Sequence, residues 1–292
     1  MDIKHIVVGT DFSDEADAAA KQSLGIARRT GAQITLVHAC PVVEPPSRTV
    51  TTQWSALMQR HLSTNRKRLE ELRVSMSGQG PEISHMVVDD VPDAGLASSA
   101  TDLDAQLIAV GTRGFTGVKH LLLGSVAEKV VRRSPVSVLV ARPSSNQAQG
   151  GYHHILVPTD FSDAAEFALQ SAVALAAEGA RIEVWHWWHS PYGGPLPDPE
   201  SLRQEIESST HAAGETLVER YRAPHLQMSF GTAEAPPNFG IQQRLTAGGD
   251  YDLVVTGSHG RHGVTRWLIG SVAEATVRHA PCSVLVARAP VS

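Results

Sequence analysis

Residues 107–125 read LIAVGTRGFTGVKHLLLGS, and residues 253–271 repeat the pattern as LVVTGSHGRHGVTRWLIGS. Each copy consists of a short apolar run, then Gly-x-x-Gly, nine further residues and Gly-Ser. Glycines directly after a strand allow a tight turn and bring backbone N–H groups close to a ligand. A Gly-Ser at the start of the next helix adds unpaired N–H groups and a helix dipole, which favour an anion. The stretch therefore predicts a strand–loop–helix phosphate site in each half of the chain.

The repeat extends well beyond this loop. Residues 5–13 read HIVVGTDFS and residues 154–162 read HILVPTDFS, and the run VLVAR follows the last helix of both halves. A repeat of domain length differs from the repeats of a solenoid, which run about 20 to 50 residues. We therefore predict two tandem domains, residues 1–143 and 152–292, joined by a polar, Gly/Ser-rich linker at residues 144–151.

Strand and helix signals alternate along each domain. In the first domain they predict strands at residues 3–9, 33–39, 83–88, 106–110 and 137–141, and helices at residues 13–29, 53–76, 93–102 and 126–133. This alternation is typical of an α/β domain with a doubly wound, parallel, five-stranded sheet and helices on both faces. In such sheets ligands bind beyond the carboxyl ends of the strands, where the strand order reverses. If the first strand lies beside the fourth, Asp11 and the loop that begins at Gly111 meet in that crevice.

Asp11 and Asp160 each follow the first strand of their half, and two roles are open to them. Either carboxylate can accept hydrogen bonds from a ribose or a base. Alternatively, it begins the following helix, with Ser13 or Ser162 as the N-cap residue. The neighbouring phosphate loop favours the binding role.

Ser125 and Ser271 also have two interpretations. Ser125-x-x-Glu128 and Ser271-x-x-Glu274 both fit a capping box, which stabilises the start of a helix without any ligand. A capping box leaves other N–H groups available, so a cap and a phosphate site are compatible. The glycine spacing favours phosphate, because a cap alone does not require the three loop glycines.

The same spacing excludes two neighbouring classes of nucleotide site. The loop is not Gly-x-x-x-x-Gly-Lys-Ser/Thr, so it is not the phosphate loop of the common nucleoside triphosphatases. Gly-x-Gly-x-x-Gly does not follow the first strand, so a dinucleotide site is unsupported.

Composition narrows the function classes further. A net charge of −5 argues against a broad surface for nucleic acid or an anionic membrane. No apolar run approaches the roughly 20 residues of a membrane span, and the N-terminus lacks the pattern of a signal peptide. Cys40 and Cys282 lie at unmatched positions and suggest no disulfide framework. We therefore expect a cytoplasmic protein that binds neither nucleic acid nor a membrane.

Together, these motifs closely resemble the universal stress protein family in its tandem two-domain form. The spacing Gly-x-x-Gly-x9-Gly-Ser and the Thr-Asp after the first strand look like the signature of the family's ATP-binding branch, and both halves carry them. The resemblance implies the strand order 3-2-1-4-5, with adenine near the first two strands, ribose near Asp11 or Asp160, and phosphates on the glycine loop. It also implies that the two domains pair through their last strands, at residues 136–140 and 282–286.

The resemblance implies a matched set of ATP-binding residues in the two halves. In the first half they are Gly9, Thr10, Asp11, Gly111, Thr112, Arg113, Gly114, Gly117, Gly124, Ser125 and Val126. In the second half they are Pro158, Thr159, Asp160, Gly257, Ser258, His259, Gly260, Gly263, Gly270, Ser271 and Val272.

Metal binding is considered because the chain has 14 histidines. Two close pairs have a spacing that suggests a metal, His186 with His189 and His259 with His262, but each falls short of the three or four ligands that zinc sites need. We expect no dedicated metal site, whereas Mg²⁺ or Mn²⁺ would arrive with ATP.

Two function classes follow from the resemblance. Members of the family are mostly stress-response and signalling proteins; some hydrolyse ATP slowly, and others bind no nucleotide. Asp11 and Asp160 are the carboxylates placed near the sites, and both already have ribose roles. We therefore favour an ATP-binding regulator that is not an enzyme, with a slow ATP hydrolase or phosphotransferase as the alternative. The sequence is also compatible with a homodimer.

The two halves differ most in the predicted second strand. Trp185 and Trp187 occupy the places of Val37 and Ala39 and share one face of the strand. They are either a differently packed core or a change in the adenine pocket, where an indole can stack on the base or fill the space. After the third strand, we match Gly231-Thr232 to Asp89-Asp90 of the first half.

Overall fold

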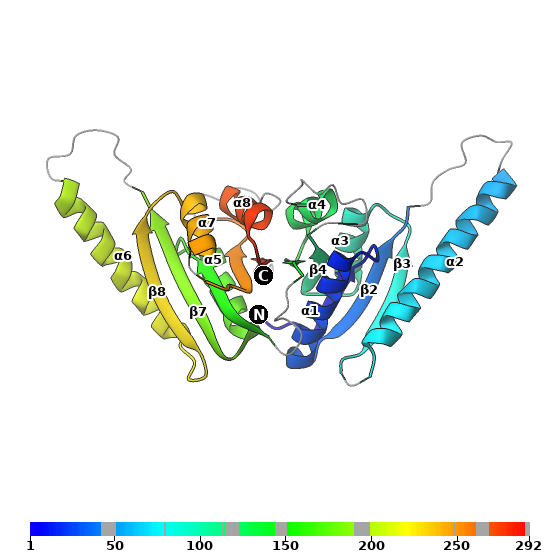
Figure 1. The fold of residues 1–292 in the computed structure, drawn as a ribbon, viewed down its shortest axis with the longest axis horizontal. Helices are drawn as coiled ribbons and strands as arrows, with labels where there is room; N and C mark the ends of the chain where they lie inside the picture. The colour runs from blue at the N-terminus through cyan, green and yellow to red at the C-terminus, as the bar shows by residue number, and fades with distance from the viewer. Residues whose placement is uncertain are drawn as a thin grey trace. The chain divides into compact units, whose positions relative to one another are not determined.

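The computed structural model describes residues 1–41, 51–78, 80–112, 114, 123–143, 151–189, 199–247, 249–260 and 269–289. The chain divides into two compact units, residues 2–150 and residues 151–292 (Figure 1).

The first unit alternates strands and helices throughout. Its elements are β1 (His5–Gly9), α1 (Asp14–Thr30), β2 (Gln33–Ala39), α2 (Thr51–Met76), β3 (Ile83–Val88), α3 (Pro92–Asp102), β4 (Leu107–Gly111), α4 (Ser125–Arg133) and β5 (Ser137–Ala141). The strands lie in the order β3-β2-β1-β4-β5, and every neighbouring pair is parallel. This is the predicted doubly wound α/β fold with its predicted strand order.

The second unit repeats this order. Its elements are β6 (Tyr152–Pro158), α5 (Asp163–Leu175), β7 (Ala176–Trp188), α6 (Pro199–Tyr221), β8 (Gln227–Glu234), α7 (Pro237–Ala247), β9 (Leu253–Gly257), α8 (Ser271–His279) and β10 (Ser283–Ala287). The strands lie in the order β8-β7-β6-β9-β10, again parallel. Figure 1 shows helices packed against the sheet of each unit.

The core of each unit is its central strand pair. Ile6, Val7 and Val8 of β1 are fully buried, as are Leu253, Val254 and Val255 of β9. Continuous apolar runs of this kind belong to parallel strands that are covered on both faces. The central strands therefore form a rigid base for the loops at their carboxyl ends. Among the described residues, no helix is long and apolar enough to cross a membrane.

The start of α1 confirms the predicted cap. Ser13 is the N-cap residue, and its side chain accepts a hydrogen bond from the Ala16 N–H. Gly31 ends the helix in the left-handed conformation, with φ of 74°, as its position predicted. Ser162 caps α5 in the same way through the Ala165 N–H.

One predicted match between the halves is wrong. Gly231 and Thr232 lie inside β8, where Gly231 pairs with Trp185. In the first unit the equivalent pair is Met86 with Val37, so Gly231 corresponds to Met86 and not to Asp89. A Cβ at Gly231 would lie 2.5 Å from the Trp185 ring, so the glycine makes room for the indole.

Candidate functional site

The predicted loops meet at the carboxyl end of the central strands. Because β1 is parallel to β4 and β6 to β9, the segments that follow each pair emerge at the same edge of the sheet. A Cβ added to Gly260 would lie 2.5 Å from Asp160 Oδ2, and one added to Gly114 would collide with Asp11 Oδ2. In each unit, therefore, the carboxylate after the first strand lies against the second loop glycine.

A compact turn fixes each of these carboxylates. Asp11 Oδ1 accepts hydrogen bonds from the Ser13 N–H at 3.1 Å and the Ser13 hydroxyl at 2.5 Å. The Phe12 N–H donates to Thr10 Oγ1 at 3.0 Å, and Phe12 has a φ of 64°. A positive φ is uncommon outside glycine and persists where the surroundings fix it.

The second unit has the same turn. Asp160 Oδ1 accepts from the Ser162 N–H and hydroxyl at 3.1 and 2.5 Å, and Phe161 has a φ of 61°. The two interpretations of the aspartate are thus compatible. One oxygen organises the helix start, while the other lies beside the glycine loop.

Matched histidines support these turns from the second strand. His38 Nδ1–H donates to the Thr10 carbonyl at 2.8 Å, and His186 Nδ1–H donates to the Thr159 carbonyl at 2.7 Å. The His186 ring also contacts Phe161, with centroids 5.0 Å apart. In both units, therefore, a histidine near the end of the second strand packs against the turn that holds the aspartate.

The first loop glycine has a structural reason that needs no ligand. A Cβ at Gly111 would lie 2.6 Å from the backbone of Glu15, and one at Gly257 would lie 2.8 Å from the backbone of Ala164. Both glycines therefore allow the first helix of the unit to pack closely on the sheet. Gly111 and Gly257 are consequently required by packing, and the loop glycines that indicate a phosphate site are the later ones.

The predicted capping boxes are wrong. Gly124 and Gly270 are the N-cap residues of α4 and α8, so Ser125 and Ser271 are the first residues inside the helices. The Gly124 N–H donates to the Thr112 carbonyl at 2.7 Å, and the Gly270 N–H to the Ser258 carbonyl at 2.8 Å. These bonds fix the N-cap one residue earlier than a capping box requires.

The helix starts consequently offer backbone donors. The N-cap residues Gly124 and Gly270 have no side chain that could accept hydrogen bonds from the first N–H groups of α4 and α8. The first N–H groups of a helix have no partner inside the helix. Those of α4 and α8 can therefore serve an anion at the end of the glycine loop.

A cavity of about 740 Å³ lies at this place in the second unit. Nine of the predicted second-half residues line it: Pro158, Thr159, Asp160, Gly257, His259, Gly260, Gly270, Ser271 and Val272. Ser258 is buried, and its hydroxyl is 2.8 Å from His259 Nδ1. The structure thus gathers the end of β6, the glycine loop and the start of α8 around one cavity.

In the first unit, the predicted residues take corresponding places. Gly9 ends β1 and Gly111 ends β4, while Thr112 is buried and Val126 is exposed on α4. Arg113, Gly117 and Gly263 lie outside the described residues.

Of the apolar wall of the second cavity, the sequence pointed to Trp187 alone. This wall comes from the end of β7, from α7 and from the residue before Gly270: Trp187, Trp188, Pro237, Ile241 and Ile269. Trp187 lines the cavity without closing it. The tryptophan-rich end of β7 was the available signal, but its alignment with α7 becomes visible only in the fold.

The ionisable side chains that line the cavity are Asp160, His186, His189 and His259. Nowhere in the described ranges do three or more histidine, cysteine, aspartate or glutamate side chains gather as metal ligands would.

Comparisons with a family profile and with individual relatives agree on one protein family. The universal stress protein family profile matches residues 2–142 and 151–288. A universal stress protein of Mycolicibacterium smegmatis is 28% identical, over 97% of this chain and 96% of the relative. One of Mycobacterium tuberculosis is 29% identical over the same shares.

Solved structures show the same fold. A universal stress protein from Archaeoglobus fulgidus aligns with a TM-score of 0.64 at 19% identity, covering 97% of this chain and 98% of that one. A functionally unknown protein of Pseudomonas aeruginosa aligns with a TM-score of 0.65 at 18% identity, over 99% and 93% of the two chains.

Proposed function

Because the chain belongs to the universal stress protein family, we propose that it is an ATP-binding regulator of stress response or signalling, with one nucleotide site in each half. The observation that carries the proposal is the cavity of the second unit. It brings Asp160, the glycine loop and the start of α8 together with an apolar wall. Each part suits a different part of a nucleotide.

The residues divide by the chemistry they offer. Asp160 can accept hydrogen bonds from ribose hydroxyls, the role that a carboxylate elsewhere in dinucleotide-binding α/β folds has. The N–H groups around Gly260 and in the first turn of α8, which begins at Ser271, suit phosphate oxygens. The apolar wall of Trp187 and Ile241 suits a heteroaromatic base. A divalent ion would enter with the triphosphate, bound mainly by phosphate oxygens.

Regulation is favoured over catalysis by the chemistry of the lining residues. Efficient phosphoryl transfer needs a positioned water or base together with a charge clamp on the phosphates. The lining carboxylate, Asp160, uses one oxygen in the turn to Ser162 and faces Gly260 with the other. We therefore propose that the site holds ATP, with slow hydrolysis or phosphotransfer as the alternative.

A glycine substitution tests the proposal at the second site. In the full chain, Gly260→Leu would put a side chain onto Asp160 Oδ2. We expect calorimetric titration with ATP to lose one of two binding events of millimolar or tighter affinity. Gly25→Ala is the matched control, because a Cβ at Gly25 meets nothing within 4 Å. Unchanged binding in the Gly260→Leu variant would contradict the proposal.

A further inference from the structure

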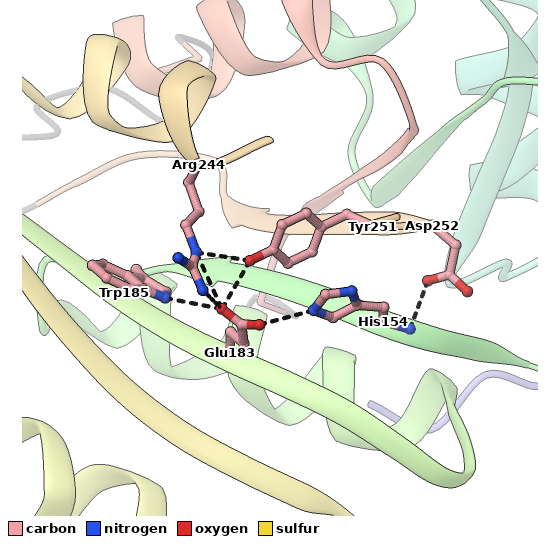
Figure 2. A network of polar contacts seen from close by, with 6 residues as sticks. All are labelled: His154, Glu183, Trp185, Arg244, Tyr251 and Asp252. Atoms are coloured by element: carbon pink, nitrogen blue, oxygen red, sulfur yellow. Dashed lines mark hydrogen bonds and ion pairs between the residues drawn. The ribbon is translucent and has the colours of Figure 1, made fainter. Parts of the chain in front are cut away.

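A charged cluster surrounds a buried carboxylate, that of Glu183, on the middle of β7 in the second unit. The Glu183 side chain is 8% exposed and pairs with Arg244 of α7. Tyr251 Oη donates to Glu183 Oε2 at 2.8 Å, and His154 Nε2 lies 2.9 Å from Glu183 Oε1. Figure 2 shows these side chains and Trp185 converging on the one carboxylate.

The first unit has small or neutral groups in the equivalent places. Strand register matches Glu183 to Thr35, and Thr35 Oγ1 lies 2.8 Å from His5 Nε2. Helices α3 and α7 begin with Pro92 and Pro237. Counted from these prolines, Ser99 takes the place of Arg244. The charged cluster is thus a feature by which the second unit differs from its repeat.

Burying the Glu183 carboxylate costs solvation that its attraction to the half-buried Arg244 guanidinium does not always recover. Packed apolar residues of similar size would often give equal or greater stability. Stability alone therefore does not explain why the second unit has this cluster. Its contacts with the residues of the cavity wall suggest another role.

The cluster continues into the cavity wall through the two indoles. Trp185 Nε1–H donates to Glu183 Oε2 at 3.2 Å, and the Arg244 guanidinium lies 4.5 Å from the centroid of the Trp185 ring. Trp185 in turn stacks on Trp187, with centroids 5.5 Å apart and an interplanar angle of 22°. Trp187 lines the cavity.

The same cluster also fixes α7. A Cβ at Gly240 would collide with the Trp187 ring, so the helix backbone lies directly on the indole. Arg244, one turn further along α7, is held by Glu183 and by Tyr251 Oη at 2.9 Å. Pro237 and Ile241 of this helix line the cavity beside Trp187.

We propose that Glu183 and Arg244 are positioning residues for base recognition in the second site. They hold the Trp185–Trp187 stack and α7 together, so that Trp187 and Ile241 form a preorganised wall for a planar heteroaromatic base. This rests on the proposed nucleotide function and extends it to the base, because the second unit has Trp185 and Trp187 where the first has Val37 and Ala39.

The test uses the full chain with Gly114→Leu, which leaves the second site as the site under study. Glu183→Gln removes the charge that pairs with Arg244. We expect the ATP dissociation constant to rise about tenfold, and the exciton signal of the stacked indoles in far-ultraviolet circular dichroism to fall. Tenfold corresponds to one side-chain contact of ordinary strength.

Glu166→Gln is the matched control. Glu166 also accepts hydrogen bonds from a tyrosine and an arginine, Tyr221 and Arg220, but on α5 and α6 and outside the cavity lining. We expect this variant to keep both the affinity and the exciton signal. Loss of affinity in both variants would reveal general destabilisation and overturn the proposal.

A second variant keeps the test decisive if Glu183→Gln does not fold. Trp185→Phe retains an aromatic ring but removes the N–H that donates to Glu183, and it should also weaken ATP binding. Native affinity and native signal in a folded Glu183→Gln variant, or native affinity in Trp185→Phe, would overturn the proposal. If the Gly114→Leu parent binds no ATP, the nucleotide function of this site fails, and the exciton signal alone decides whether Glu183 positions the indoles.

Discussion

The two oxygens of each site aspartate have separate environments. Asp160 Oδ1 serves the turn to Ser162, whereas Oδ2 lies against Gly260. The sequence presented these roles as alternatives, and only the three-dimensional turn shows that one carboxylate can serve both.

Asp160→Asn should separate them. The amide oxygen can still accept from Ser162, so the free energy of unfolding should change little. Loss of a charged acceptor for ribose should weaken ATP binding at the second site by about 1.5 to 3 kcal/mol. Asp163→Asn, a substitution in the first turn of α5, provides the control. An Asp160→Asn variant with the calorimetric ATP affinity of the wild type would show that Asp160 does not bind the ribose.

Glu183 should also make the second unit sensitive to acid. Burial raises the pKa of its carboxyl group, but hydrogen bonds from Arg244, His154 and Tyr251 outweigh burial and lower the pKa to about 2. A folded-state pKa below the ordinary value of 4.5 means that the stabilisation is complete above pH 4.5. It is then lost as the pH falls from 4.5 towards 2.

The shift corresponds to roughly 3 kcal/mol. Urea unfolding of wild type and Glu183→Gln at pH 6 and pH 3 measures it. The difference in unfolding free energy between the two proteins should shrink at the lower pH. A difference that stays constant would show that the carboxylate is not held in its ionised form by the cluster.

At the scale of the element, the loop glycines have different tasks. Gly257 allows α5 to approach the sheet, whereas Gly260 allows the loop to approach Asp160. Gly257→Ala should therefore lower the free energy of unfolding by about 1 to 3 kcal/mol through overpacking. Thermal unfolding beside the Gly25→Ala control measures the loss. A Gly257→Ala protein of native stability would mean that α5 can shift without cost.

Most elements could be predicted from the sequence because their signals are local. The bounds of β2, β3 and β5 agree with the predicted residues 33–39, 83–88 and 137–141. The sequence predicts that the fourth strand begins at Gln106, one residue before the observed start of β4 at Leu107. Its side chain instead accepts hydrogen bonds from the Lys4 and His5 N–H groups, at 2.8 and 3.0 Å.

What the sequence missed depends on contacts between distant residues. Ser125-x-x-Glu128 has the pattern of a capping box, but the bond from Gly124 to Thr112 sets the helix start one residue earlier. The Glu183 cluster joins residues 61 and 68 positions apart along the chain. No local pattern marks such a cluster, because each member alone reads as an ordinary strand or helix residue.

At the scale of the whole molecule, we expect two nucleotide sites of unequal affinity. The phosphate loops are matched, whereas the base-side walls differ at Trp185 and Trp187.

We also expect very slow turnover. Single-turnover hydrolysis of ATP should be slower than about 1 s⁻¹, the low end of ordinary enzyme rates. Faster hydrolysis that depends on Asp160 would favour the enzyme alternative.

The central claim is that both glycine loops hold ATP, and the binding stoichiometry of the full chain tests it most directly. Calorimetric titration should give two ATP molecules per wild-type chain. It should give one for Gly114→Leu or Gly260→Leu alone, and none for the double variant, while Gly25→Ala keeps two. Undiminished ATP binding in a folded double variant would contradict the claim.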